Sequence, residues 1–249
     1  MDKIESAAQL FAAAWTGNRK FDALPHELQP ATFDECHAIQ DATVRILGET
    51  IGGWKVGLGK DGVITRAPIF ARLIHDSGAQ LDSKTLPMLS IESEIGFRFN
   101  KPLPKRDADY SREEVSAVVD AFPAIELLNS RYVDTSKRSQ LERVADCFVQ
   151  GGIVRGEPRA DWRSIDFSHQ SVRLVVDGVT VANNTGTHPT GDPIGSVVAL
   201  VNKLRQGAGV QAGQLMITGT WTGITTVKAN SRVEVLFEGF KPLKAQFMP

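Results

Sequence analysis

The segment from Leu89 to Phe99 constrains the fold most, because it sets two acids within an apolar run. Its isoleucine and phenylalanine residues are typical of a β-strand. Residues two apart in a strand point to the same face, so Glu92 and Glu94 project together, about 7 Å apart along the backbone. Burying such a pair is costly unless water or a cation compensates it, and an oxygen-only cluster suits Mg²⁺ or Mn²⁺. A row of solvent-exposed acids is the alternative interpretation.

Composition excludes several classes of function. The chain has 249 residues, 42% apolar and 23% charged, which is enough for a sizeable core and ordinary for a globular protein. A formal charge of -1 gives no reason to expect nucleic acid or an anionic membrane as a partner. Cys36 and Cys147 are far apart and predict reduced thiols. No signal-like or bilayer-spanning run is visible, so we expect a cytoplasmic protein.

The first part of the chain predicts two helices. Residues 2–16 carry apolar side chains at helical spacing. A second helix is expected to begin at Thr32, which has the residue types of a capping box, and to stop at Gly48. We therefore predict an N-terminal helical lobe formed by residues 1–50 and a larger body formed by residues 51–249.

The body begins with glycine-rich, strand-like sequence around one lysine. Lys55 lies between Trp54 and Val56, and the surrounding glycines allow close approach of backbones. Two interpretations remain open. Lys55 is either a surface lysine beside a turn or a lysine held in a pocket, where burial would lower its pKa or a bound anion would pair with it.

A third acid follows in the segment after the polar loop. Ser111 and Glu114 predict the start of a helix whose buried face extends to Phe122 and which ends at Pro123. Residues 124–128 then read as a buried strand with Glu126 in its middle. A carboxylate among isoleucine and leucine needs compensation, so Glu126 is the third candidate ligand.

The second half of the chain contains further helix and strand signals, with no internal repeat. The Asp177-Gly178 pair predicts a two-residue hairpin with a type I′ turn. Asp192 and Pro193 are typical of the start of a helix. The expected elements are a charged helix over 134–146, strands over 147–154, 171–176, 179–183 and 214–218, a helix over 193–204, a hydroxyl-rich glycine loop over 219–223, and a last strand over 232–237.

Five short motifs together resemble those of a known family. They are Gly53-Trp54-Lys55-Val56-Gly57, Glu92-x-Glu94, Ala124-Ile125-Glu126 followed by Ser130-Arg131, Gly191-Asp192-Pro193-Ile194, and Ile217-Thr218-Gly219-Thr220. Over residues 3–239 the chain resembles 2-keto-4-pentenoate hydratases and their sister group, the 4-oxalocrotonate decarboxylases, within the fumarylacetoacetate hydrolase superfamily. The resemblance implies an α+β fold with a mixed β-roll or barrel, surrounding helices, an N-terminal helical lobe and assembly as a homo-oligomer.

The resemblance also implies a site and a reaction. Glu92, Glu94 and Glu126 match the acids that bind Mg²⁺ or Mn²⁺, which chelates the carboxylate and 2-oxo oxygen of a short acid. Lys55 matches the catalytic lysine thought to assist proton transfer or hold substrate, and Thr220 is the expected contact for the substrate carboxylate. The leading hypothesis is a metal-dependent lyase that hydrates 2-hydroxypenta-2,4-dienoate to 4-hydroxy-2-oxopentanoate.

Two departures from the family pattern bear on the reaction. Phe70-Ala71-Arg72 stands where hydratases tend to have Phe-Ala-Asp, so a cation replaces a carboxylate expected in acid–base chemistry, for which Asp76 or His75 is a candidate substitute. Arg72 would suit a second substrate carboxylate, and hence decarboxylation of a dicarboxylic acid, unless it is a plain surface arginine. Asp192 also stands where a histidine is common.

Other functions remain as alternatives. A hydrolase cleaving a carbon–carbon bond of an acylpyruvate is one, although such hydrolases usually carry an aspartate in place of Glu126. An inactive family member acting as a binding or scaffold protein is another, and Arg72 is the feature that favours it. The chain has no Gly-x-Ser-x-Gly elbow or phosphate loop. Four of its histidines lack metal-ligand spacing and are read as structural or exposed, namely His26, His37, His169 and His188.

Overall fold

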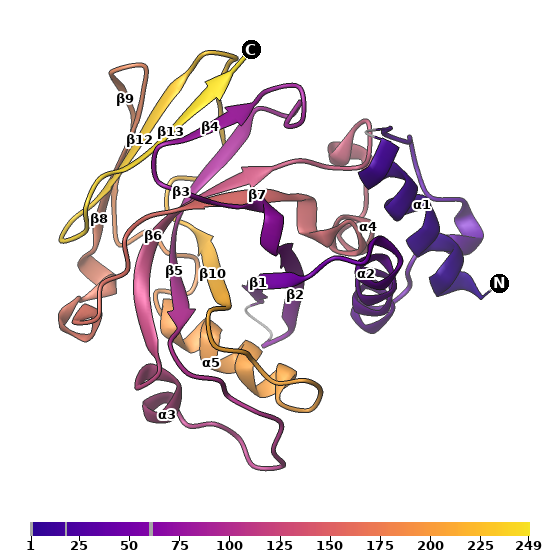
Figure 1. Cartoon of the computed structure of the whole chain (residues 1–249), viewed down its shortest axis with the longest axis horizontal. Helices are drawn as coiled ribbons and strands as arrows, with labels where there is room; N and C mark the ends of the chain where they lie inside the picture. The colour runs from indigo at the N-terminus through magenta and orange to yellow at the C-terminus, as the bar shows by residue number, and fades with distance from the viewer. Residues whose placement is uncertain (1, 18, 60–61) are drawn as a thin grey trace.

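The computed structural model describes residues 2–17, 19–59 and 62–249 and combines helices with two mixed β-sheets (Figure 1). Its helices are α1 (Lys3–Gly17), α2 (Phe33–Leu47), α3 (Arg112–Ser116), α4 (Gln140–Ala145) and α5 (Pro193–Leu204). Its strands are β1 (Ile51–Leu58), β2 (Ile64–Phe70), β3 (Ile74–Asp76), β4 (Ala79–Asp82), β5 (Ser90–Phe99), β6 (Val119–Leu128), β7 (Gln150–Arg155), β8 (Ser171–Val176), β9 (Val179–Thr185), β10 (Leu215–Thr220), β11 (Thr225–Thr226), β12 (Arg232–Phe237) and β13 (Leu243–Met248). Short 3-10 turns are η1 (His26–Leu28), η2 (Ala71–Leu73), η3 (Thr135–Lys137), η4 (Cys147–Val149), η5 (Trp162–Ser164) and η6 (Phe167–His169). The expected α+β class is confirmed.

The first sheet is curled. Its strand order is β2-β1-β10-β5-β6-β7-β3, and β11 pairs with β5 outside this path. The β1–β10 and β3–β7 pairs are parallel and the others are antiparallel. Strand β2 at one end contacts β7 near the other end, so the sheet bends round to form a half-barrel (Figure 1). The concave face of this half-barrel carries the functional residues discussed below.

The second sheet and α5 cover the convex side of the first. The second sheet has the order β4-β13-β12-β8-β9, and α5 packs against β1, β10 and β5. The largest hydrophobic cluster takes Ile95 and Phe97 from β5, Val235 and Phe237 from β12, and Leu200 from α5. This core fixes β5 rigidly from its convex face, which leaves its other face free for polar groups.

A glycine controls the approach of strands on the concave face. Gly96 lies on the same face of β5 as Glu92 and Glu94, because it follows Glu94 by two residues. A Cβ at Gly96 would lie 2.5 Å from Phe122 Cζ on β6 and 2.9 Å from the Met216 carbonyl oxygen on β10. The three strands pack this closely because position 96 has no side chain.

The N-terminal helices α1 and α2 pack against each other, and α2 also packs against α4. Their cluster includes Phe11, Ile39 and Tyr132. Thr32 caps α2 by accepting a hydrogen bond from the Glu35 N–H, and Gly48 ends α2 in the left-handed conformation at φ 63°, as predicted. Contacts with α4 tie the helical lobe to the body, and the domain boundary at residue 50 stays a prediction. Within the described ranges, no helix is long and apolar enough to cross a membrane.

The helix predicted to run to Phe122 is wrong. Helix α3 ends at Ser116, and Val119 already belongs to β6, which continues through Pro123. Nearly every residue of β6 is buried, with Ala121 and Ile125 in the main core and Phe122 on the concave side. A strand buried on both faces gives a continuous apolar run, which periodicity alone does not distinguish from a buried helix.

Other elements differ in extent. The charged segment over 134–146 forms only η3 and α4, and residues 147–149 form η4 before β7 begins. The strand expected to be last is followed by β13, whose sequence Leu-Lys-Ala-Gln-Phe-Met alternates in burial as a strand with one buried face does. The hairpin at Asp177-Gly178 and the helix that begins at Asp192-Pro193 are confirmed.

Candidate metal centre

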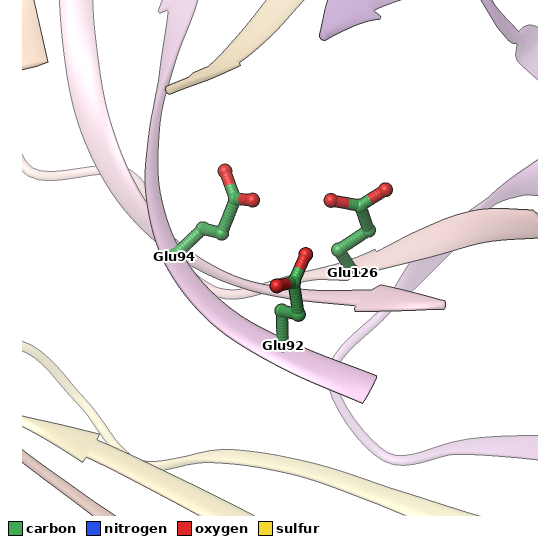
Figure 2. Close-up of side chains that lie close together, drawn as sticks. All are labelled: Glu92, Glu94 and Glu126. Atoms are coloured by element: carbon green, nitrogen blue, oxygen red, sulfur yellow. The ribbon is translucent and has the colours of Figure 1, made fainter. Parts of the chain in front are cut away.

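The sheet register brings three glutamates together. Glu92 on β5 lies directly opposite Glu126 on β6, and Glu94 lies two residues further along β5. One carboxylate oxygen from each lies within 4.8 Å of the others, and Figure 2 shows all three side chains pointing into the same space. Glu94 is 2% exposed and Glu126 is 1% exposed. The alternative of a solvent-exposed row of acids is therefore wrong for this strand pair.

Burial makes these carboxylates hard to ionise. Burial raises the pKa of Glu126 to about 8. Burial and, to a smaller extent, the charge of Glu126 together raise the pKa of Glu92 to about 7. It raises the pKa of Glu94 to about 6, with a smaller contribution from the charge of Glu92. Like charges directly opposite in a sheet destabilise it. The cluster thus carries a cost that a cation would offset.

The remaining contacts of the carboxylates leave room for a cation. The Gly219 N–H donates a hydrogen bond of 2.8 Å to Glu94 Oε2. Glu126 Oε1 forms an ion pair with Lys55 Nζ. Among the described residues, no donor reaches Glu126 Oε2, although it is buried. A buried carboxylate oxygen without a donor, beside two further carboxylates, fits a hard divalent cation such as Mg²⁺ or Mn²⁺.

Lys55 faces the same space from the far side of the curled sheet. Its side chain is buried, and Nζ donates a hydrogen bond of 2.7 Å to the Phe148 carbonyl oxygen and lies 4.9 Å from the centre of the Phe148 ring. Strands β1 and β6 are three strand spacings apart, about 14 Å in a flat sheet. The Lys55–Glu126 ion pair therefore depends on the curl, and the interpretation of Lys55 as a surface lysine is wrong.

One cavity joins these groups. Its volume is about 260 Å³, at the small end for a ligand pocket, and its walls combine carboxylates, apolar side chains and the glycine loop. Thr220 lies on this wall, and its Oγ1 accepts hydrogen bonds from the N–H groups of Thr222 and Gly223. The lining residues are Lys55, Val56, Gly57, Leu58, Glu92, Glu94, Glu126, Phe148, Pro189, Thr190, Ile217, Thr218, Gly219 and Thr220.

The structure does not bring Arg72 into this cavity. Arg72 is half exposed, forms a 2.5 Å ion pair with Glu49 and lines a different cavity, as does His75. Asp76 is exposed and forms a 2.8 Å ion pair with Arg155. The expected contact of Arg72 with a substrate in the acid cavity, and the idea that His75 or Asp76 supplies the missing carboxylate there, do not fit these positions.

Asp192 and His188 have structural contacts, and Phe148 lines the cavity although its sequence carries no signal for this. Asp192 caps α5 through the Gly195 N–H and pairs with Arg112, which accounts for an aspartate at this position. His188 is buried and its Nε2 lies 2.9 Å from the Thr218 carbonyl oxygen. Phe148 was missed as a cavity residue, because its carbonyl and its backbone conformation have no side-chain signature.

Comparisons with known proteins agree with this geometry. The family model described as fumarylacetoacetate (FAA) hydrolase C-terminal matches residues 70–248. The chain is 27% identical to a 2-keto-4-pentenoate hydratase of Paraburkholderia xenovorans over 98% of this chain and 94% of that protein. It is 27% identical to a 4-oxalocrotonate decarboxylase of Pseudomonas sp. strain CF600 over 81% and 79% of the two chains. The structure of a 4-oxalocrotonate decarboxylase from Pseudomonas putida G7, complexed with magnesium and adipate, superposes with a TM-score of 0.85 at 22% identity over 98% and 97% of the chains.

Proposed function

Since the chain belongs to the fumarylacetoacetate hydrolase family, we propose that it is a divalent-metal-dependent lyase that hydrates a short 2-hydroxydienoate or 2-oxo acid. The observation that carries this proposal is the buried cluster of Glu92, Glu94 and Glu126, which shares one small cavity with Lys55. Relatives named as hydratases over nearly the full length of the chain support the same reaction class.

The three glutamates are the proposed ligands of Mg²⁺ or Mn²⁺. When bound, the cation would supply Lewis-acid stabilisation of the negative charge that develops on the 2-oxo oxygen of the substrate. The N–H of Gly219 holds one oxygen of Glu94 in place. This contact fixes the direction of that carboxylate before any ion arrives, as a supporting hydrogen bond should.

Lys55 is the proposed proton-transfer residue. Hydration of 2-hydroxypenta-2,4-dienoate moves the enol proton to carbon 5, then adds hydroxide to carbon 4 and a proton to carbon 3. A group that can give and take protons must therefore lie against the carbon chain. The Lys55 ammonium is held over the acid cluster by Glu126 and the Phe148 carbonyl, and its apolar surroundings limit access of bulk water.

Thr220 is the proposed anchor for the substrate carboxylate. Its oxygen accepts hydrogen bonds from two backbone N–H groups, which occupy its lone pairs and turn its own hydrogen away from the loop. No acceptor for that hydrogen is present among the described residues. A substrate carboxylate in the cavity would provide one, and the contact would set the carbon chain beside Lys55.

The decarboxylase alternative has support from relatives with that name. The feature that favoured it in the sequence was Arg72, and this residue lies outside the acid cavity. Among the described residues that line that cavity, the only basic side chain is Lys55, which is already paired with Glu126. The proposed substrate is therefore a monocarboxylic acid, and hydration is favoured.

Product analysis tests the proposal. Purified protein is incubated with Mg²⁺ or Mn²⁺ and, in separate reactions, with 2-hydroxypenta-2,4-dienoate, 4-oxalocrotonate or an acylpyruvate. Product masses are recorded as the substrate absorbance falls. We expect a product from the first acid that is heavier by one water, and no metal-dependent reaction in Glu94→Gln. Loss of carbon dioxide from the second acid alone would make the protein a decarboxylase, and cleavage of an acylpyruvate would make it a hydrolase. No reaction with any of these acids would favour a binding protein.

A further inference from the structure

The turn η4, which supplies a wall of the acid cavity, has an unfavourable backbone. Cys147, Phe148 and Val149 have φ values of 46°, 52° and 63°. Left-handed conformations are costly for any residue with a Cβ and most costly for a β-branched residue such as Val149. Three consecutive residues in this state do not persist without strong support from their surroundings.

A buried arginine provides that support from both ends of the turn. The Arg131 guanidinium donates a 2.9 Å hydrogen bond to the Asp146 carbonyl oxygen, just before the turn, and a 2.8 Å hydrogen bond to the Gln150 carbonyl oxygen, just after it. Its Nε also pairs with the Asp146 carboxylate, whose other oxygen accepts hydrogen bonds from Ser130 Oγ and the Arg131 N–H. The planar fork of one guanidinium thus fixes the two backbone ends between which the left-handed residues lie.

The turn η4 also determines where Lys55 points. Among the described residues, the polar contacts of Lys55 Nζ are the Phe148 carbonyl oxygen and Glu126. The Phe148 ring lies beside the same ammonium. If the turn relaxed to an ordinary right-handed or extended conformation, the carbonyl would rotate away from Lys55. The ammonium would then keep Glu126 as its one polar partner among the described residues, and it would be held less firmly.

We infer that Arg131 and Asp146 are positioning residues that hold the left-handed turn 147–149 so that the Phe148 carbonyl aims Lys55 into the acid cavity. The inference rests on the proposed role of Lys55. It assigns no contact with substrate or metal to Arg131 or Asp146. Its consequence is that damage to this support should reduce turnover without loss of the cation site, because the glutamates lie on β5 and β6 and not on the turn.

Arg131→Lys is the first test, because it keeps a positive charge beside buried Asp146 but cannot reach both carbonyls. We expect kcat to fall on the order of 10²-fold, as small misplacements of a reacting group do, with KM and the affinity for Mn²⁺ unchanged. The second readout uses metal-free protein, in which acetylation of Lys55 by an amine-reactive ester is followed by peptide mass. Lys55 should react faster in the variant than in the wild-type chain.

A rescue experiment separates positioning from general stability. Adding Val149→Gly to Arg131→Lys should restore most of kcat and the slow acetylation, since glycine adopts positive φ without strain. Arg138→Lys is the matched control, because Arg138 pairs with Glu142 nearby and does not contact the carbonyls of the turn. It should leave both readouts as in the wild-type chain.

Each outcome decides the inference. A folded Arg131→Lys protein with unchanged kcat and unchanged acetylation of Lys55 overturns it, and so does a change confined to KM or to Mn²⁺ affinity. If Arg131→Lys does not fold, the pair Arg131→Gln with Asp146→Asn is measured instead, and failure of both to fold assigns these residues a purely structural role. If the wild-type chain turns over none of the acids, the proposed function fails, and the acetylation rates alone decide the positioning role.

Discussion

The acid cavity and the cavity lined by Arg72 differ in how their charges are balanced. The first has a volume of about 260 Å³ and holds three carboxylates and one ammonium. The second has a volume of about 510 Å³ and is lined by Arg19, Lys20, Arg72 and Arg131. In the second, Arg72 pairs with Glu49 and Arg131 pairs with Asp146, while Asp82 also lines the wall and the described residues form no ion pair with Arg19 or Lys20. In the first, one lysine faces three acids, so negative charge is left unbalanced. The comparison teaches that the acid cavity, although it is the smaller of the two, is the one whose excess charge a bound cation would offset.

Of these tests of the difference between the two cavities, Glu94→Gln should have the largest effect. The variant removes one negative charge from the proposed ligand set. Loss of a residue that only supports a metal ligand lowers metal affinity by up to about 10²-fold. Loss of a ligand should therefore lower Mn²⁺ affinity by at least about 10²-fold. Turnover should be lost while the fold is kept. Titration of Mn²⁺ into the metal-free variant measures the effect. Wild-type affinity in this variant would show that the carboxylates do not form the metal site.

The pH dependence of the free energy of unfolding gives a second test of the charge in the acid cavity. The carboxyl pKa values lie above the ordinary 4.5, at about 6, 7 and 8, so over this range the three carboxyls bind more protons in the native metal-free protein than in the unfolded chain. Their contribution to the free energy of unfolding should therefore fall as the pH rises from 4.5 to about 8. The lowered pKa values of buried His37 and His188 act in the opposite direction below pH 6.5.

Urea unfolding in EDTA and in saturating Mg²⁺ measures this dependence. Mg²⁺ should raise stability most at the high end of this range, because the ion replaces protons on the carboxylates. Glu94→Gln should reduce the slope in EDTA. A slope in EDTA that is the same in Glu94→Gln as in the wild-type chain would contradict the raised pKa of Glu94.

Arg72→Gln should have the smallest effect. The variant removes a half-exposed ion pair with Glu49, which is worth at most about 1 kcal/mol of the free energy of unfolding. Values of kcat and KM for the dienoate should stay as in the wild-type chain, because Arg72 does not line the acid cavity. Steady-state kinetics and thermal unfolding check both statements. A large rise in KM would return Arg72 to the substrate-binding role that the sequence suggested.

Local signals in the sequence predicted local structure well. The two-residue period placed Glu92 and Glu94 on one face of a strand, and the residues at Thr32, Gly48 and Asp192 identified helix ends. These features depend on chemistry within a few residues of chain, which the sequence contains directly.

Features that depend on pairing between distant segments could not be predicted in this way. The opposition of Glu92 and Glu126 is a matter of register between β5 and β6. The misassigned stretch from Val119 to Phe122 carries apolar residues on both faces, so its period does not separate a strand from a helix. The position of Arg72 beside Glu49 follows from the antiparallel pairing of β1 with β2. The position of Phe148 beside Lys55 follows from the curl of the sheet, for which the sequence shows only scattered glycines.

Gly96 allows the strands of the curled sheet to approach each other closely. Gly96 has a hydrogen atom where other residues have a Cβ. This hydrogen faces Phe122 on one neighbouring strand and the Met216 carbonyl on the other, so β5 can bend towards both. Glu92 and Glu94 precede Gly96 on the same bent strand, and Lys55 faces them across the cavity. In the proposed function, backbone curvature at Gly96 would therefore influence the radius of ion and the length of acid that the cavity accepts, although Gly96 itself does not line that cavity.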